Sequence, residues 1–543
     1  MTLRLGTICR RRKGRGMNNI VLKIAGKICR IGITRLRVQQ QINEIPSAQL
    51  ELQIPTDSND ADETQTLNAV GSFTTGASVV IELDNATLFS GYLTQKKMSL
   101  RGKLWSVRLE ARHALQTLTF FPRSRVFRQQ DDGAILNTLF RQAEVTMART
   151  AAKQLSRQHE QLVQFRVSDW HFMRSRLLST NCWMLPDAAS NNVRVVPLAK
   201  PERQPHRLDR HSDRAGYSLY DIDLTFDNRF TPDSLSLQGW DIATQQLSPA
   251  FKSGTSQFDP WKTTSGIGPA TPSWRRQAYL QAFSCLPETS LDTLARSWMN
   301  HLQLTGVQGR IELDGTRDFK LGESIELNKF GAGLDGTAIL TGVNQRFDTA
   351  QGWRSELLIG MPGALLEPVP PVQSLHIATV AEFTADPQQL DRIPIYLPAL
   401  NLPGESIFAR LGKPWASHGS GFCFYPEPGD EVVVGFIEND PRYPIILDAM
   451  HNPKNNAPFP PDKKNNRKGL VMNSADAKAS LLIDSENNTL TLSEGKSSIT
   501  LTGKGAESLQ LRADAIIQQA EKGLSLHGKT QVEITSASIN MKK

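Results

Sequence analysis

The sequence predicts a mainly β protein, with an α+β amino-terminal region that contains two related β-barrels, then a small closed barrel, then short strands to the end. Three observations predict this fold class. Short strand-like runs separated by Gly, Pro and Asn turns recur along the chain. Two β segments far apart in the chain look like copies of each other. Residues 469–543 contain only short strands with two or three apolar side chains each.

Length and composition set the outer limits. The 543 residues allow about three or four domains. The chain is 39% apolar and 21% charged, which is typical of a soluble protein with sizeable cores. No run reaches the ~18 apolar residues of a membrane-spanning helix. These values exclude an integral helical membrane protein and a disordered chain.

The five cysteines predict reduced thiols. Their number is odd, and no pair with another Cys or with His has the spacing of a zinc site. We therefore expect neither a disulfide framework nor a structural metal. The cysteines are Cys9, Cys29, Cys182, Cys285 and Cys423.

The net charge of +8 depends on the first sixteen residues, which carry six Arg or Lys and no acid. Subtracting those six charges leaves +2 for the rest of the chain. Because the charges follow a short apolar stretch, the segment is not a secretory signal. We expect residues 1–17 to be a disordered basic extension, with Met17 as the natural start. A nuclear or nucleic-acid-binding tail is the alternative.

Three helices interrupt the predicted strands of the amino-terminal region. The first follows a cap at Asp131 or Asp132, the second starts near Asp169, and the third follows Ser290. Between the last two, 185–285 is expected to hold long loops and some strands. The apolar faces are Ile135, Leu136, Leu139 and Ala143; Trp170, Met173 and Leu177; and Leu291, Leu294, Ala295, Trp298 and Leu302.

The internal repeat consists of three matching pairs of segments in the same order. A real duplication explains this order better than a chance likeness between two barrels. The pairs are Gly76–Leu83 with Gly322–Leu327, Gly91–Gln95 with Gly342–Gln345, and Gly102–Ser106 with Gly352–Ser355.

Clusters of Pro, Gly and Asn mark the boundaries between segments in the rest of the chain. A stiff linker at 361–375 precedes about six short β runs in 376–452, enough for a small closed barrel. A second linker occupies 453–468. The strands of 469–543 cannot bury enough surface in one chain, so they wind into a solenoid or intertwine between chains. Without a strict period, we expect an intertwined, triple-stranded β-helix or prism.

The most specific motif lies within 421–446. A Gly-Asp turn leads into a run of valines, and an Asp-Pro turn leads out of it. This order resembles the OB-fold of VgrG-type spike proteins, which share their plan with myophage tail hub-and-spike proteins. The motif residues are Gly429, Asp430, Glu431, Val432, Asp440, Pro441 and Pro444.

Two further stretches resemble the same family. Val167–Met173 is similar to a helix start in the hub of late-control-type tail proteins, and 309–360 is similar to the second barrel of that hub. Two features depart from the family pattern. Leu411–Trp415 stands where a Trp-Arg-Val strand is usual, and Ile446–His451 replaces a Gly-rich ending. These departures favour an extracellular, antifeeding-prophage-type particle over a type VI secretion spike.

The resemblance implies a homotrimeric spike in the centre of a contractile injection particle. Residues 18–360 would form the tail hub, 376–452 the OB-fold and 469–543 the membrane-puncturing needle. The implied partners are inner tube and baseplate proteins, a PAAR-type tip protein, effector cargo and the target membrane, without nucleic acid. The particle would be assembled in the bacterial cytoplasm and be extracellular or secreted. The expected tip contact is Ile539, Asn540, Met541, Lys542 and Lys543.

No catalytic, cofactor-binding or metal site is expected. The gap from Asn452 to Lys468, where phage relatives carry a lysozyme domain, is too short for a catalytic domain. Asp221 and Asp223 are interpreted as solvated carboxylates. His206 and His211, five residues apart, are interpreted as surface histidines.

The alternative function is an OB-fold module that binds nucleic acid or oligosaccharide through exposed aromatics and a basic groove. Surrounding acids argue against phosphate binding, and we expect the aromatics to pack in the core. The aromatics are Trp415, Phe422, Phe424 and Tyr425, and the acids are Glu427, Asp430, Glu431, Glu438 and Asp440.

Overall fold

The computed structural model forms two units, Met1–Ala449 and Met450–Lys543, which are described separately. The predicted extension at 1–17, Cys9, His211 and Cys285 lie outside the described residues. The structure describes residues 19–55, 60–149, 152–199, 201, 203–210, 217–227, 229, 231–232, 234–253, 261–263, 278–282, 286, 288–331, 333–362, 369–473 and 478–541.

The hub, defined here as β1–β23 with α1–α5, is mainly β. Its helices are α1 (Asp60–Gly71), α2 (Asp132–Gln142), α3 (Ala152–Leu155), α4 (Asp169–Ser179) and α5 (Glu288–Gln303), with a 3₁₀ turn at Ala114–Thr119. Its strands are β1 (Ile20–Ile24), β2 (Lys27–Cys29), β3 (Ile33–Gln39), β4 (Ser47–Pro55), β5 (Ser78–Leu83), β6 (Ala86–Arg101), β7 (Leu104–Arg112), β8 (Pro122–Asp131), β9 (Thr146–Arg149), β10 (Gln158–Ser168), β11 (Cys182–Pro186), β12 (Asn192–Pro197), β13 (His206–Asp209), β14 (Leu219–Phe226), β15 (Leu235–Asp241), β16 (Gln246–Leu247), β17 (Phe251–Ser253), β18 (Trp261–Thr263), β19 (Ala278–Ala282), β20 (Val307–Asp314), β21 (Ser324–Asn328), β22 (Gly336–Asp348) and β23 (Gly352–Ile359).

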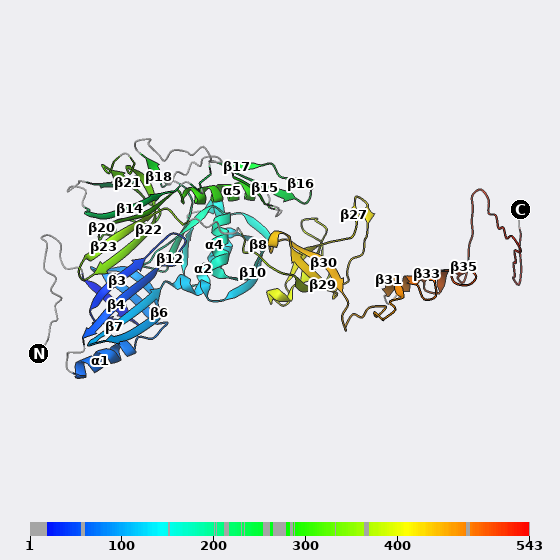
Figure 1. Cartoon of the computed structure of the whole chain (residues 1–543), viewed down its shortest axis with the longest axis horizontal. Helices are drawn as coiled ribbons and strands as arrows, with labels where there is room; N and C mark the ends of the chain where they lie inside the picture. Colours follow the sequence, from blue (N-terminus) through cyan, green and yellow to red (C-terminus); the bar gives the residue numbers. More distant parts are fainter. Residues whose placement is uncertain are drawn as a thin grey trace. The chain divides into compact units, whose positions relative to one another are not determined.

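Two series of hub strands share one order, β3-β4-β7-β6-β5 and β14-β20-β23-β22-β21. The three segment pairs of the sequence repeat fall on β5 and β21, β6 and β22, and β7 and β23. Where the sequence predicts two barrels, pairing of β3 with β22 joins both series into one 14-stranded sheet (Figure 1). Equal strand order at equal sequence positions supports the duplication.

The three predicted helices form where they are expected. Asp131 caps α2, since its carboxylate accepts a hydrogen bond from the Ala134 N–H at 2.6 Å. The Ser168 hydroxyl caps α4 in the same way, and α5 begins at Glu288, ahead of Ser290. Helix α1 was not predicted, because its sequence has little apolar periodicity.

Separate cores lie beneath these elements. One packs inside the first strand series and another inside the second. Helices α2 and α4 bury a third core against β11 and β12. All four residues predicted for the α2 face, from Ile135 to Ala143, are buried in it. Helix α5 packs on β15 and β17 with Leu291, Leu294 and Ala295.

The strands after the linker form a closed barrel in the order β24-β25-β26-β30-β29. Five strands close it, where about six β runs were predicted, because the extra hairpin β27–β28 pairs only with itself. Two 3₁₀ turns lie at Pro398–Leu400 and Ile437–Asn439. The strands are β24 (His376–Val380), β25 (Arg392–Tyr396), β26 (Ser406–Leu411), β27 (Ala416–Ser417), β28 (Ser420–Gly421), β29 (Glu431–Phe436) and β30 (Pro444–Met450).

The second unit is an antiparallel five-stranded sheet, β31-β32-β33-β34-β35. The strands predicted at 524–526 and 532–534 are not formed, since one chain offers these segments no neighbouring strand. Among the described residues, no helix is long and apolar enough to cross a bilayer. The strands are β31 (Arg467–Asn473), β32 (Lys478–Asp484), β33 (Thr489–Glu494), β34 (Ser497–Thr502) and β35 (Ser508–Arg512).

Candidate functional site

The sequence motif forms one edge of the closed barrel. Gly429 has φ +94°, a backbone conformation that favours glycine, and the Asp430 carboxylate accepts a hydrogen bond from the Glu427 N–H at 2.9 Å. Strand β29 follows at once, with Val432 and Val434 fully buried. The Gly-Asp turn therefore aims the valine run into the barrel core.

The Asp-Pro turn of the motif holds a buried ion pair. The Asp440 carboxylate accepts hydrogen bonds from Arg442 Nε at 2.9 and 3.1 Å and from its Nη2 at 2.5 Å. The side chains are only 9% and 14% exposed. Burial alone would lower the pKa of Arg442, but the charge of Asp440 raises it. Asp440 therefore holds the turn and does not belong to an acidic rim.

A pair of hub strands packs into the core of the barrel. Strands β8 and β10 pair with each other, and Val163 and Phe165 of β10 are part of the barrel core. The Phe165 ring lies 5.1 Å from the His376 ring and 5.7 Å from the Phe436 ring. Arg166 Nε donates to the carbonyl of Ala399 at 2.8 Å. Hub and barrel therefore share a core, which sequence reasoning did not predict.

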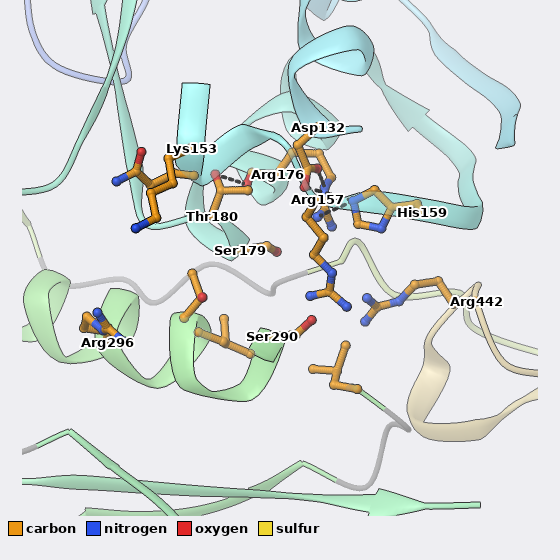
Figure 2. A pocket seen from close by; sticks show the side chains of 14 residues that line it. Asp132, Lys153, Arg157, His159, Arg176, Ser179, Thr180, Ser290, Arg296 and Arg442 are labelled. Atoms are coloured by element: carbon orange, nitrogen blue, oxygen red, sulfur yellow. Dashed lines mark hydrogen bonds and ion pairs between the residues drawn. The ribbon is translucent and has the colours of Figure 1, made fainter. Parts of the chain in front are cut away.

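A buried charge cluster lies beside this strand pair, at the start of α2. The Asp132 carboxylate accepts a hydrogen bond from Arg176 Nε at 2.7 Å and lies 2.9 Å from His159 Nε2. Figure 2 shows the three side chains converging. Burial would raise the pKa of Asp132, but Arg176 and His159 outweigh it and lower the pKa to about 2.

This cluster predicts a pH dependence of stability. The folded-state pKa of Asp132 lies below its unfolded value of about 3.9, so its contribution is complete above pH ~4 and is lost as the pH falls toward 2. The contribution is roughly 2 kcal/mol. Urea unfolding of Asp132→Asn should therefore show a weaker loss of stability from pH 4 to 2. Asp221→Asn should keep the wild-type slope, and an unchanged slope in Asp132→Asn would contradict the assignment.

The barrel aromatics are not in the core, so that prediction was wrong. Trp415, Phe422, Phe424 and Tyr425 are all exposed, on and beside the β27–β28 hairpin. The hairpin stands outside the closed barrel, so these rings have no core to enter. The Tyr425 hydroxyl donates to Asp391 at 2.8 Å.

The remaining candidate residues lie apart from one another. Asp221 and Asp223 are exposed on β14, and Asp221 pairs with Arg310 at 3.0 Å. His206 lies 3.1 Å from Glu323 and is partly exposed. Among the described residues, no group of three or more His, Cys, Asp or Glu could hold a metal.

The sheet of the second unit has one apolar face and one mostly polar face, on which Val471 and Leu482 are the aliphatic residues. Strand pairing places the apolar residues opposite each other in two rows on the same face. Eight of them are between 38% and 62% exposed. The rows are Leu470, Leu481, Leu492, Ile499 and Leu511, and then Ile483, Leu490, Leu501 and Leu509.

The opposite face carries hydroxyl side chains in matching positions. Ser480 Oγ lies 2.8 Å from Ser493 Oγ, and Thr491 Oγ1 lies 3.5 Å from Thr500 Oγ1. Contact with water is favourable for the hydroxyl side chains of this face and unfavourable for the apolar side chains of the other face. The single chain therefore leaves a continuous apolar surface unpartnered.

The expected tip-contact residues lie beyond this sheet. Ile539 and Met541 are exposed, and the described part of the segment, 539–541, forms no strand. Lys542 and Lys543 lie outside the described residues.

Two protein-family models match the chain. Residues 18–348, more than half of the chain, match the family model described as the Alg8 N-terminal domain. The chain belongs to this family. Residues 376–451 match the model of the type VI secretion system/phage-baseplate injector OB domain. The closed barrel is therefore the OB-fold that the motif predicted.

Solved structures share the fold at low sequence identity. A Francisella PdpA-VgrG complex matches with TM-score 0.58 and 10% identity, over 91% of this chain and 80% of the other. The half-lidded form of this complex matches with TM-score 0.56 and 10% identity, over 91% of this chain and 88% of the other. The E. coli c3393 protein is described as a type VI secretion component similar to phage T4 gp27 and gp5. It matches with TM-score 0.50 and 13% identity, over 79% of this chain and 99% of the other. Comparison with the curated proteins gives no match. The fold is that of a VgrG-like hub with its OB barrel.

Proposed function

We propose that this protein is the central hub and spike of a contractile injection particle. The observation that carries the proposal is the apolar face of β31–β35, because its two rows hold nine Leu and Ile side chains, eight of them exposed, that need partners. The same sheet in another copy of the chain offers a matching apolar face, so copies of this chain are the proposed partners. In a needle shared between chains, the apolar rows would pack against one another and the hydroxyl rows would face the solvent.

Three copies fit the rest of the chain. The hub contains two strand series of the same order, so three chains present six similar units in a ring. A ring of six matches the sixfold symmetry of a tube, so inner tube and baseplate are the proposed partners of the hub. The proposed work is mechanical and not enzymatic: sheath contraction drives the rod through a target envelope.

The free end of the needle is proposed to bind a PAAR-type tip protein through residues 539–543. Deleting Ile539–Lys543 should abolish co-purification with the tip protein and leave the trimer intact, since β31–β35 remain. A double Lys504→Gln and Lys529→Gln variant, which removes two charges elsewhere in the unit, is the matched control. Tip binding that survives the deletion would contradict the proposal.

The setting of the particle follows from the same proposal. We favour an extracellular, antifeeding-prophage-type particle, assembled in the bacterial cytoplasm and carrying effector cargo to a target membrane. The departures at Leu411–Trp415 and Ile446–His451 support this choice over a type VI apparatus.

A second candidate function is binding of nucleic acid or oligosaccharide. The observation in its favour is the exposed aromatic hairpin with Trp415, Phe422 and Phe424. A gel-shift assay at low salt with the chain starting at Met17 tests it. We expect no shift, and a shift lost in Trp415→Ala would favour this function.

A further inference from the structure

A cavity of about 390 Å³ lies between the hub and the OB barrel and is lined by an excess of positive charge. Side chains from α2, α3, β10, α4, α5 and the Asp-Pro turn of the barrel meet there (Figure 2). Its five cationic residues are Lys153, Arg157, Arg176, Arg296 and Arg442.

Carboxylates neutralise only three of these cations. Asp132 pairs with Arg176, Asp440 with Arg442, and Asp292 with Arg296. Within the described part of the chain, Lys153 and Arg157 have no ion-pair partner. Figure 2 shows Arg157 extending from the Asp132 group toward Arg442, so two guanidinium groups face each other across the cavity. Burial and the nearby charge of Arg176 lower the pKa of Arg157, although Asp132 opposes them, and Arg442 adds to the lowering.

Two buried polar atoms of the cavity wall also lack partners. Arg176 Nη1 and Ser290 Oγ make no hydrogen bond to any residue that the structure describes, although Arg176 is only 3% exposed. An unmade hydrogen bond from a buried polar group is costly, so both atoms indicate a missing acceptor. Ser290 lies in the first turn of the 16-residue helix α5, whose amino end carries partial positive charge.

We propose that this cavity binds a small oxyanion of the phosphate type, held by Arg157, Arg176 and Arg442 with the Ser290 hydroxyl. Guanidinium groups suit phosphate oxygens because they donate paired hydrogen bonds in a fixed plane. The anion would supply the acceptor that Arg176 and Ser290 lack. Bound between Arg157 of the hub and Arg442 of the barrel, the anion would offset the repulsion between the two guanidinium groups. Its attraction to both would hold the hub and the barrel together. This inference is independent of the spike function.

Calorimetric titration of the full chain with inorganic phosphate, in a chloride buffer at pH 7, tests the proposal. We expect saturable binding that is roughly tenfold weaker in Arg157→Gln and weakened to a smaller degree in Ser290→Ala. Arg108→Gln removes an exposed hub arginine outside the cavity and should bind as the wild type does. A second titration with glycerol 3-phosphate distinguishes the two sources of the anion. Tighter binding of glycerol 3-phosphate indicates a phosphomonoester as the natural ligand, and tighter binding of inorganic phosphate indicates free phosphate.

Three results would overturn the proposal. The first is no saturable binding of either phosphate compound at millimolar concentration. The second is equal binding by wild type and Arg157→Gln when thermal unfolding shows both folded. The third is binding of acetate with phosphate excluded, which would assign the cavity to a carboxylate of a polypeptide.

Discussion

A chain truncated after Lys468 is expected to lose the needle and all binding of the tip protein, while its first unit stays folded. The truncation removes β32–β35 and most of β31, and with them both apolar rows. The hub and barrel keep their own cores, which contain no residue of the second unit. Thermal unfolding and co-purification with the tip protein measure the two effects separately. Tip binding by the truncated chain would contradict the account.

Point substitutions on the two faces of the needle sheet give a sharper test of the same idea. Leu492→Gln places an amide in an apolar row, whereas Thr491→Gln places it on the hydroxyl face of the same strand. Burying an unpartnered amide costs about 1–3 kcal/mol per site, and a trimer repeats the cost three times. We expect Leu492→Gln to weaken assembly strongly and Thr491→Gln to leave it intact. Equal behaviour of the two variants would contradict the proposed facing of the sheet.

Replacing Asp440 by Ala is expected to cost about 3–5 kcal/mol of the stability of the first unit. The change leaves the buried Arg442 guanidinium in the same cavity as Arg157 and Arg176 without its ion-pair partner, and only the weaker charge of Asp132, which already pairs with Arg176, remains to offset it. Chemical denaturation monitored by tryptophan fluorescence measures the loss. The effect is large because removing one member of a buried pair leaves an uncompensated charge.

The matched control for Asp440→Ala is Asp221→Ala. Asp221 also pairs with an arginine, but both side chains are nearly half exposed. Surface pairs contribute about 0–1 kcal/mol, so this variant should unfold close to the wild type. If both variants lose equal stability, the Asp440–Arg442 pair does not hold the barrel turn.

Local chemistry explains which parts of the fold could be predicted. The Asp131 cap and the apolar spacing after it locate α2, and the Gly429-Asp430 turn locates β29, because both signals act within a few residues. Helix α1 lacks such a signal: its sequence is mostly polar, and Val70 is its buried apolar residue among those described.

Long-range packing explains the failures. The aromatics near Trp415 were assigned to a core by residue type, but the β27–β28 hairpin lies outside the barrel. Phe165 enters the barrel core from a hub strand more than 200 residues away in sequence, and no local pattern reveals such a contact. The five cavity cations come from five separate segments of the chain for the same reason, although each is a plain surface-type residue in the sequence.

Mass measurement by light scattering tests the central claim most directly, because the proposed needle cannot form from one chain. Three chains of 60.3 kDa give a particle of about 180 kDa. The account predicts that mass for the full chain at micromolar concentration, and a smaller mass for Leu492→Gln. A stable monomer of 60.3 kDa for the full chain would contradict it.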